Sequence, residues 1–168
     1  MKKSKLLLSL ILTGAITLTG CSSEKKEEVK NNNSSTSTQT PVKNSNEAKL
    51  GEKLIFENEA EITVKKAEWT DERNPAADIE AKKVLLVTYD VKNLTGKDYS
   101  VGYETDLYIN GKKAEPYHIK VTLETISANR MLESATQAFA VNEDGDLELE
   151  VRPFMSTKEK KIIKLNLK

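Results

Sequence analysis

The chain has 168 residues, with 26 basic and 26 acidic side chains and no formal net charge. This length predicts one folded domain with appended segments, and the balanced charge argues against nucleic acid as a partner, because a generic nucleic-acid binder carries a basic excess. A single Cys excludes an intrachain disulfide, and a single His excludes a His-rich metal site and disfavours a Ser-His-Asp site.

The N-terminal segment has the pattern of a bacterial lipoprotein signal peptide. Three lysines precede an apolar run at residues 6–18, which suits a signal h-region. The run is too short for a transmembrane helix, which needs about 20 apolar residues. It ends in Leu18-Thr19-Gly20-Cys21, which resembles the lipobox of bacterial lipoproteins.

This resemblance implies cleavage between Gly20 and Cys21, with a diacylglycerol on the Cys21 thiol. The alternative is an ordinary secretory signal in which Cys21 stands by chance. Each acyl CH₂ that enters the membrane contributes about 0.8 kcal/mol, so two or three chains retain the protein there. We therefore expect residues 1–20 to be removed and the mature chain to be lipid-anchored at the extracellular face of the cell membrane.

A flexible linker is expected between this anchor and the folded domain. Residues 31–46 consist mainly of Asn, Ser and Thr, with Val42 as the only aliphatic residue. Such a segment buries too little apolar surface to offset the entropy lost on ordering. Residues 21–49 are therefore predicted to form the lipidated N-terminus and linker, and residues 50–168 the domain.

Alternating apolar and polar residues predict a strand-rich domain from Leu50 onward. This period of two, seen at 117–123, 147–151 and 163–167, is typical of strands with one face in water. Residues 83–91 begin apolar on both faces, which indicates a central strand. A phase slip at Lys65-Lys66 predicts a bulge.

Turn signals separate the predicted strands. Asn110-Gly111 is a strong type I′ hairpin signal, and turns are also expected at 93–96 and at Asp144-Gly145. Residues 74–82 predict a helix of at most two turns, because Asn74 is a candidate N-cap and Pro75 follows it. We therefore predict an all-β fold, an immunoglobulin-like antiparallel β-sandwich of seven or eight strands.

Five segments carry a resemblance to a known family: residues 51–54, 61–64, 84–93, 107–112 and 138–141. Over residues 50–168 the chain resembles the immunoglobulin-like extracellular domain of Gram-positive lipoproteins that is catalogued as a domain of unknown function. The resemblance implies a β-sandwich outside the membrane. It brings no catalytic residues.

Polar candidate sites are weighed against ordinary structural roles. His118 is expected on the wet face of its strand, where it finds no second His for a metal site. Residues 142–146 loosely resemble a calcium loop but lack its spacing and its closing Glu, so a turn is expected. In the long loop of residues 70–83, four acids are expected to be solvated, with a divalent-cation site as the alternative: Asp71, Glu72, Asp78 and Glu80.

Aromatic residues beside this loop are candidates for a partner surface. Tyr is favoured at interfaces because its ring is apolar and its hydroxyl polar, and loops on a rigid scaffold often carry function. A place in the core is the favoured interpretation for the Tyr residues and for Trp69, and a partner surface is the alternative. The predicted surface combines the loop with the segment 99–108 and consists of Trp69, Asp71, Glu72, Asp78, Glu80, Tyr99, Tyr103 and Tyr108.

The sequence thus predicts a non-enzymatic binding module at the cell envelope, with no catalytic residues, cofactor or metal. Its partner is an envelope protein, a wall polymer or a host molecule. The alternatives are an enzyme or enzyme accessory that uses loop carboxylates, and a weak divalent-cation or small-ligand carrier. Catalysis predicts a deep pocket with converging carboxyls and perturbed pKa values, whereas binding predicts a filled core and an exposed aromatic or loop surface.

Overall fold

The computed structural model describes residues 46–167, which contain eleven strands and no helix. Accordingly, no helix within this range is long and apolar enough to cross a membrane. Gly20, Cys21 and residues 22–45 of the predicted linker lie outside the described residues. The strands are β1 (Glu47–Ala48), β2 (Lys53–Phe56), β3 (Ala60–Thr70), β4 (Lys83–Asn93), β5 (Tyr99–Val101), β6 (Thr105–Ile109), β7 (Lys112–Lys113), β8 (Glu124–Ile126), β9 (Met131–Val141), β10 (Leu147–Val151) and β11 (Lys161–Leu165).

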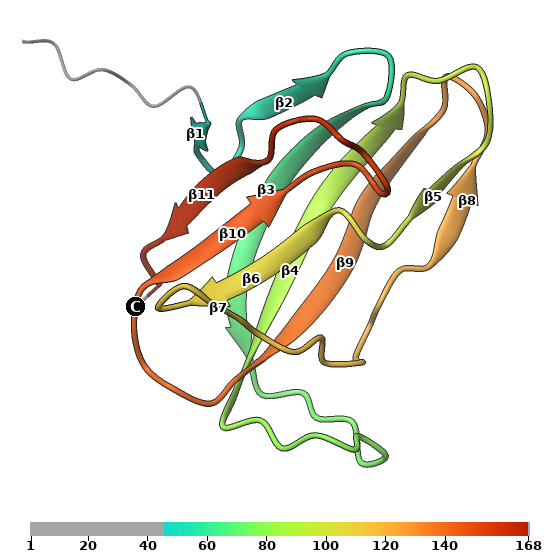
Figure 1. Ribbon diagram of the computed structural model, residues 1–168. Coiled ribbons are helices and arrows are strands. Elements are labelled where there is room, and N and C mark those ends of the chain that lie inside the picture. Colours follow the sequence, from blue (N-terminus) through green and yellow to red (C-terminus); the bar gives the residue numbers. More distant parts are fainter. Residues whose placement is uncertain (1–45, 168) are drawn as a thin grey trace, which may run out of the picture. The chain divides into compact units, whose positions relative to one another are not determined.

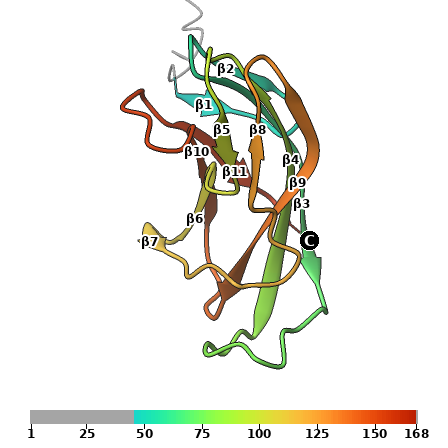
Figure 2. The same ribbon diagram turned by 90° about the vertical axis from the view of Figure 1, so that its right-hand side faces the viewer.

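The strands form a β-sandwich, which confirms the predicted fold class. One sheet has the order β2-β3-β4-β9 and the other the order β1-β11-β10-β6-β7, while β5 and β8 pair separately. Figure 1 views the sheets face-on and Figure 2 shows the two layers from the side. The chain changes sheet four times: between β1 and β2, between β4 and β6, between β7 and β9, and between β9 and β10. In this order β3-β4-β9 and β6-β10-β11 match the A-B-E and C-F-G strands of an immunoglobulin sandwich.

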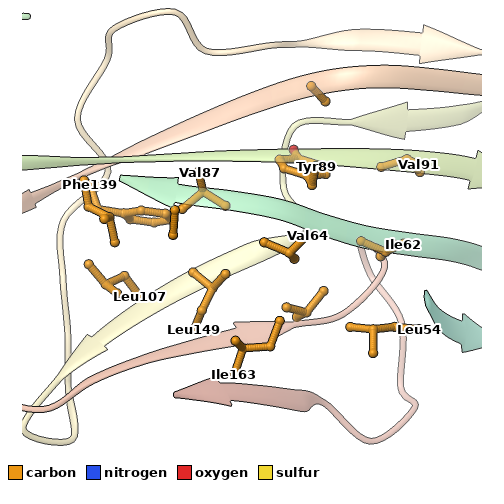
Figure 3. Packing of buried hydrophobic residues seen from close by; sticks show 14 of the residues in the cluster. Leu54, Ile62, Val64, Val87, Tyr89, Val91, Leu107, Phe139, Leu149 and Ile163 are labelled. Carbon is orange, nitrogen blue, oxygen red and sulfur yellow. The ribbon is translucent and has the colours of Figure 1, made fainter. Parts of the chain in front are cut away.

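The core lies between the two sheets. Figure 3 shows Val64, Val87 and Phe139 of one sheet facing Leu107 and Leu149 of the other. These side chains come from alternate positions, so the period of two in the sequence is the inward face of each strand. The start of β4 is buried on both faces, because its outer face is covered by a second small cluster around Tyr117 and Ile119.

Two local predictions are confirmed by the backbone. The register of β3 against β4 shifts between Val64 and Lys66, which is the predicted bulge. Asn110 and Gly111 have φ values of 49° and 78°, as a type I′ turn requires, and they join β6 to β7. A second register shift, between Tyr89 and Val91 of β4, has no sequence signal that we identified.

The segment 74–82 is not helical, contrary to the prediction. The Asn74 side chain accepts the Ala76 N–H at 2.9 Å and closes a single turn. Beyond it, the Asn142 amide accepts the Lys82 N–H at 2.9 Å and donates to the Glu80 carbonyl at 2.9 Å. These tertiary hydrogen bonds attach the backbone of Glu80 and Lys82 to Asn142 where a second helical turn would form.

Two further boundaries differ from the prediction. Residues 117–123 do not form a ladder strand, because Lys120 has a φ of 44° that interrupts the extended run. The domain also begins before Leu50, since Glu47 and Ala48 pair in parallel with Ile162 and Ile163. Ala48 is partly buried and packs against the core, and this contact attaches β1 to the domain.

A side chain joins the sheets at Thr105, where β6 extends beyond its pairing with β7. The Gln137 amide of β9 accepts the Thr105 N–H at 3.1 Å and the Thr105 hydroxyl at 2.8 Å, and it donates to the Thr105 carbonyl at 3.3 Å. The neighbouring edge of β9 is covered by the segment 114–122. The Tyr117 N–H donates to the Ala138 carbonyl, and the Ala140 N–H donates to the Glu115 carbonyl.

Candidate functional site

The acidic side chains of the long loop do not converge. Asp71, Glu72, Asp78 and Glu80 are all exposed, and Glu72 pairs with Lys120. Within residues 46–167 no group of three or more His, Cys, Asp and Glu side chains is arranged to hold a metal ion.

The loop is instead fastened to the segment 114–120. The Asn74 N–H donates to the Tyr117 hydroxyl at 3.2 Å, and its side-chain amide donates to the His118 carbonyl at 3.0 Å. Ile79 packs on the small cluster around Tyr117, and His118 is exposed as predicted. Trp69 is half-buried against the main core, with the Lys83 ammonium 5.4 Å from its ring.

The turn at residues 142–146 is tied to the β6–β7 hairpin and to β4. The Asp146 N–H donates to the Asn110 side chain at 3.1 Å, and Asp144 pairs with Lys83 at 2.9 Å. The hydrogen bond from Lys83 lowers the pKa of Asp144. The structural prediction for this segment, a turn between strands, is confirmed.

The three predicted tyrosines occupy different environments. Tyr99 is 8% exposed and its ring belongs to the core, which is the favoured interpretation, so it is not part of an exposed partner surface. Tyr108 is half-buried, with the Lys160 ammonium 5.8 Å from its ring, and Tyr103 is 53% exposed. The long loop and β5 lie towards opposite ends of the sandwich (Figures 1 and 2), so the predicted surface is not one continuous surface.

An exposed apolar surface gathers around Tyr103. Its ring lies 4.7 Å from that of Phe154, centroid to centroid, at an interplanar angle of 31°. Phe154 is 42% exposed and Met155 84%. We call these three residues the aromatic patch. It brings together the β5–β6 connection, which carries Tyr103, and the β10–β11 connection, which carries Phe154 and Met155. The sequence did not predict Phe154 and Met155 as surface candidates.

The aromatic patch borders a groove of about 440 Å³ that also reaches Pro116 and Gln137. Two ion pairs line this groove, Lys113 with Asp106 at 2.7 Å and Lys160 with Glu150. The hydrogen bond to Glu150 raises the pKa of Lys160. Arg152 also lines the groove and takes part in none of the ion pairs found within residues 46–167.

A buried carboxylate lies beneath the aromatic patch. Glu104 is 1% exposed, and it accepts four hydrogen bonds: from the Tyr89 hydroxyl at 2.8 Å, the Tyr99 hydroxyl at 3.0 Å, the Gly102 N–H at 2.8 Å and the Tyr103 N–H at 2.9 Å. Burial, and then the Glu104 charge, raise the pKa values of Tyr89 and Tyr99 well above the usual range. Both hydroxyls therefore stay protonated and donate to Glu104.

Gly102 makes this arrangement possible. Its φ of +124° is one that side-chain-bearing residues rarely adopt, and a Cβ there would lie 2.2 Å from the Thr122 carbonyl oxygen. The chain reversal at Gly102 turns two successive N–H groups towards Glu104 and presents Tyr103 outward.

Comparison with known proteins supports the fold and nothing finer. No family model and no curated protein matches the chain. Among solved structures, the yjhA protein of Bacillus subtilis is 16% identical, with a TM-score of 0.54 over 70% of this chain and 98% of that one. The secreted protein MPT63 of Mycobacterium tuberculosis is 15% identical, with a TM-score of 0.53 over 71% and 96%. The candidate lipoprotein ycdA of Bacillus subtilis is 21% identical, with a TM-score of 0.52, and the match covers 65% of this chain but 37% of ycdA.

Proposed function

We propose that this chain is a lipoprotein of a Gram-positive bacterium, anchored at the extracellular face of the cell membrane, and that its sandwich is a non-enzymatic module that binds a protein partner. The lipobox at Leu18–Cys21 supports the anchor. The descriptions of two similar structures, one a candidate lipoprotein and one a secreted protein, agree with such a location. The observation that carries the binding role is the aromatic patch.

The composition of the aromatic patch favours a protein partner. Tyr, Phe, Met and Arg are enriched in the buried centres of protein interfaces, where Lys and Glu are depleted. Tyr103, Phe154 and Met155 supply the apolar centre, and Arg152 lies beside them in the groove. An exposed apolar cluster rimmed by polar groups is typical of an interaction site, and the ion pairs of the groove supply such a rim.

The carboxylates around the groove support binding over catalysis. A general acid or base needs a carboxyl that is free to exchange a proton with a substrate. Both oxygens of Glu104 already accept hydrogen bonds, and Asp106 and Glu150 are each paired with a Lys.

Site-specific crosslinking in living cells tests this function. A photoreactive amino acid at Met155 is expected to yield an adduct with a discrete protein, and Arg152→Ala is expected to reduce its yield several-fold. The same amino acid at Ile55, which is 58% exposed on β2, is the control. Equal adducts at both positions, a polysaccharide adduct at Met155, or no adduct would contradict the proposal.

A further inference from the structure

We propose that Glu104 and Tyr99 are positioning residues, which together hold the two rings of the aromatic patch in the geometry that binds the partner. This inference rests on the proposed function. It is carried by a chain of hydrogen bonds that links both rings to one buried carboxylate.

The first link holds Tyr103. Its own backbone N–H donates to a Glu104 oxygen at 2.9 Å, next to the Gly102 N–H at 2.8 Å on the same atom. The backbone that carries the Tyr103 ring is thus fixed from inside the domain, while the ring itself is partly exposed and packs against Phe154.

The second link holds Phe154 through Tyr99. The Phe154 N–H donates to the Tyr99 hydroxyl at 3.0 Å, and this hydroxyl donates to the other Glu104 oxygen at 3.0 Å. Tyr99 lies on β5 and Phe154 follows β10, so the hydroxyl connects two segments far apart in the sequence. The connection between β10 and β11 is thereby attached to the same carboxylate as Tyr103.

Such a network lowers the cost of binding. A partner that contacts two mobile rings must order them, which costs free energy that preorganisation saves. Hydrogen bonds to a charged acceptor are roughly twice as strong as neutral ones, and burial protects these from water. The rings are therefore set in place before the partner arrives.

Two tyrosines on the same carboxylate provide a matched pair of variants. Tyr99→Phe removes the hydroxyl that accepts from Phe154, whereas Tyr89→Phe removes a hydroxyl whose only hydrogen bond within residues 46–167 is to Glu104. Each variant keeps its ring and loses one hydrogen bond to Glu104. Tyr99→Phe also loses the bond from Phe154 and leaves one Glu104 oxygen without its tyrosine donor, so it is expected to lower the thermal unfolding midpoint more than Tyr89→Phe does. They differ in the attachment of Phe154.

Amide exchange, ring contacts and crosslinking are measured on both full-length variants. Tyr99→Phe is expected to speed exchange of the Phe154 amide about tenfold, to weaken the nuclear Overhauser contact between the Tyr103 and Phe154 rings, and to lower crosslinking from Met155 several-fold. Tyr89→Phe is expected to leave all three close to those of the unsubstituted chain.

The outcomes separate the two proposals. If Phe154 exchange and the ring contact respond equally to both variants, Tyr99 does not position the patch and the inference fails, whatever the crosslinking shows. If the ring contact weakens only in Tyr99→Phe but crosslinking is unchanged, the positioning for binding is refuted. If the unsubstituted chain gives no adduct, the proposed function fails on its own.

Discussion

Asn93 offers a direct test of how the domain tolerates a buried charge. It is fully buried, and its amide group donates to three carbonyls, those of Lys97, Ile126 and Ser127, at 2.7, 3.3 and 3.1 Å. Its oxygen accepts the Thr95 N–H at 2.8 Å and the Thr95 hydroxyl at 2.7 Å. Asn93→Asp keeps the shape of the side chain but replaces the donor with an oxygen that faces those carbonyls.

The free-energy cost follows from this geometry. A buried charge that loses its partners destabilises a fold by about 3–5 kcal/mol, out of a total of roughly 5–15 kcal/mol. Burial and the three carbonyl dipoles raise the folded-state pKa of the introduced carboxyl above its unfolded value of about 3.9. The folded state then binds more protons than the unfolded state, so the stability of Asn93→Asp falls as pH rises above about 4, by about 1.4 kcal/mol per pH unit until the folded pKa is reached.

Chemical unfolding at pH 5 and pH 8 measures this effect. At pH 8 the unfolding midpoint temperature is also expected to fall by about 10–20 °C, from about 3–5 °C per kcal/mol for a domain of this size. Asn142→Asp is the control, because the exposed Asn142 has similar bonds to the Glu80 carbonyl and the Lys82 N–H. A loss in Asn93→Asp that is independent of pH, or no larger than in Asn142→Asp, would refute the reasoning.

Three further outcomes are expected. Gly102→Ala places a methyl group against the Thr122 carbonyl and is expected to lower the free energy of unfolding by about 2–4 kcal/mol. Gly96→Ala is the control, because open space surrounds Gly96, and it is expected to change stability by less than about 0.5 kcal/mol. Similar values for both variants would contradict the close approach at Gly102. Phe154→Ser removes the side chain of a residue that is 42% exposed, so stability is expected to change by no more than about 1 kcal/mol. Crosslinking from Met155 is expected to be lost in this variant, and retained crosslinking would count against the aromatic patch as the binding surface. Cys21→Ser is expected to abolish metabolic labelling with a fatty acid and to release the protein from membranes; full membrane retention without label would refute the anchor.

The strands were predictable where burial is a local pattern. In β10, Leu147, Leu149 and Val151 face the core while the glutamates between them face outward, and an alternation of this kind is visible in the sequence alone. The Asn110-Gly111 turn was also predictable, because positive φ values at two successive residues restrict the residue types that fit.

The functional candidates were less predictable because they depend on contacts between distant segments. Glu104 precedes a strand and has the appearance of a solvated acid in the sequence, yet two tyrosine hydroxyls and two backbone N–H groups enclose it. Phe154 and Met155 lie in a connection without periodicity, so their exposure follows only from the tertiary structure. The absent helix at 74–82 has the same cause, since Asn142 fixes that backbone from another strand connection.

The bridge from Gln137 to Thr105 bears on whether neighbouring copies of the domain can add strands to one another. An unpaired strand edge is a template on which another chain adds a strand and begins to aggregate. At Thr105 the Gln137 amide occupies both the N–H and the carbonyl of that edge, as the peptide group of a neighbouring strand would. Lipid anchoring would concentrate such domains in a thin layer, where encounters between copies are frequent. By occupying this edge at Thr105, the Gln137 side chain removes one place at which a neighbouring copy in that layer could add a strand.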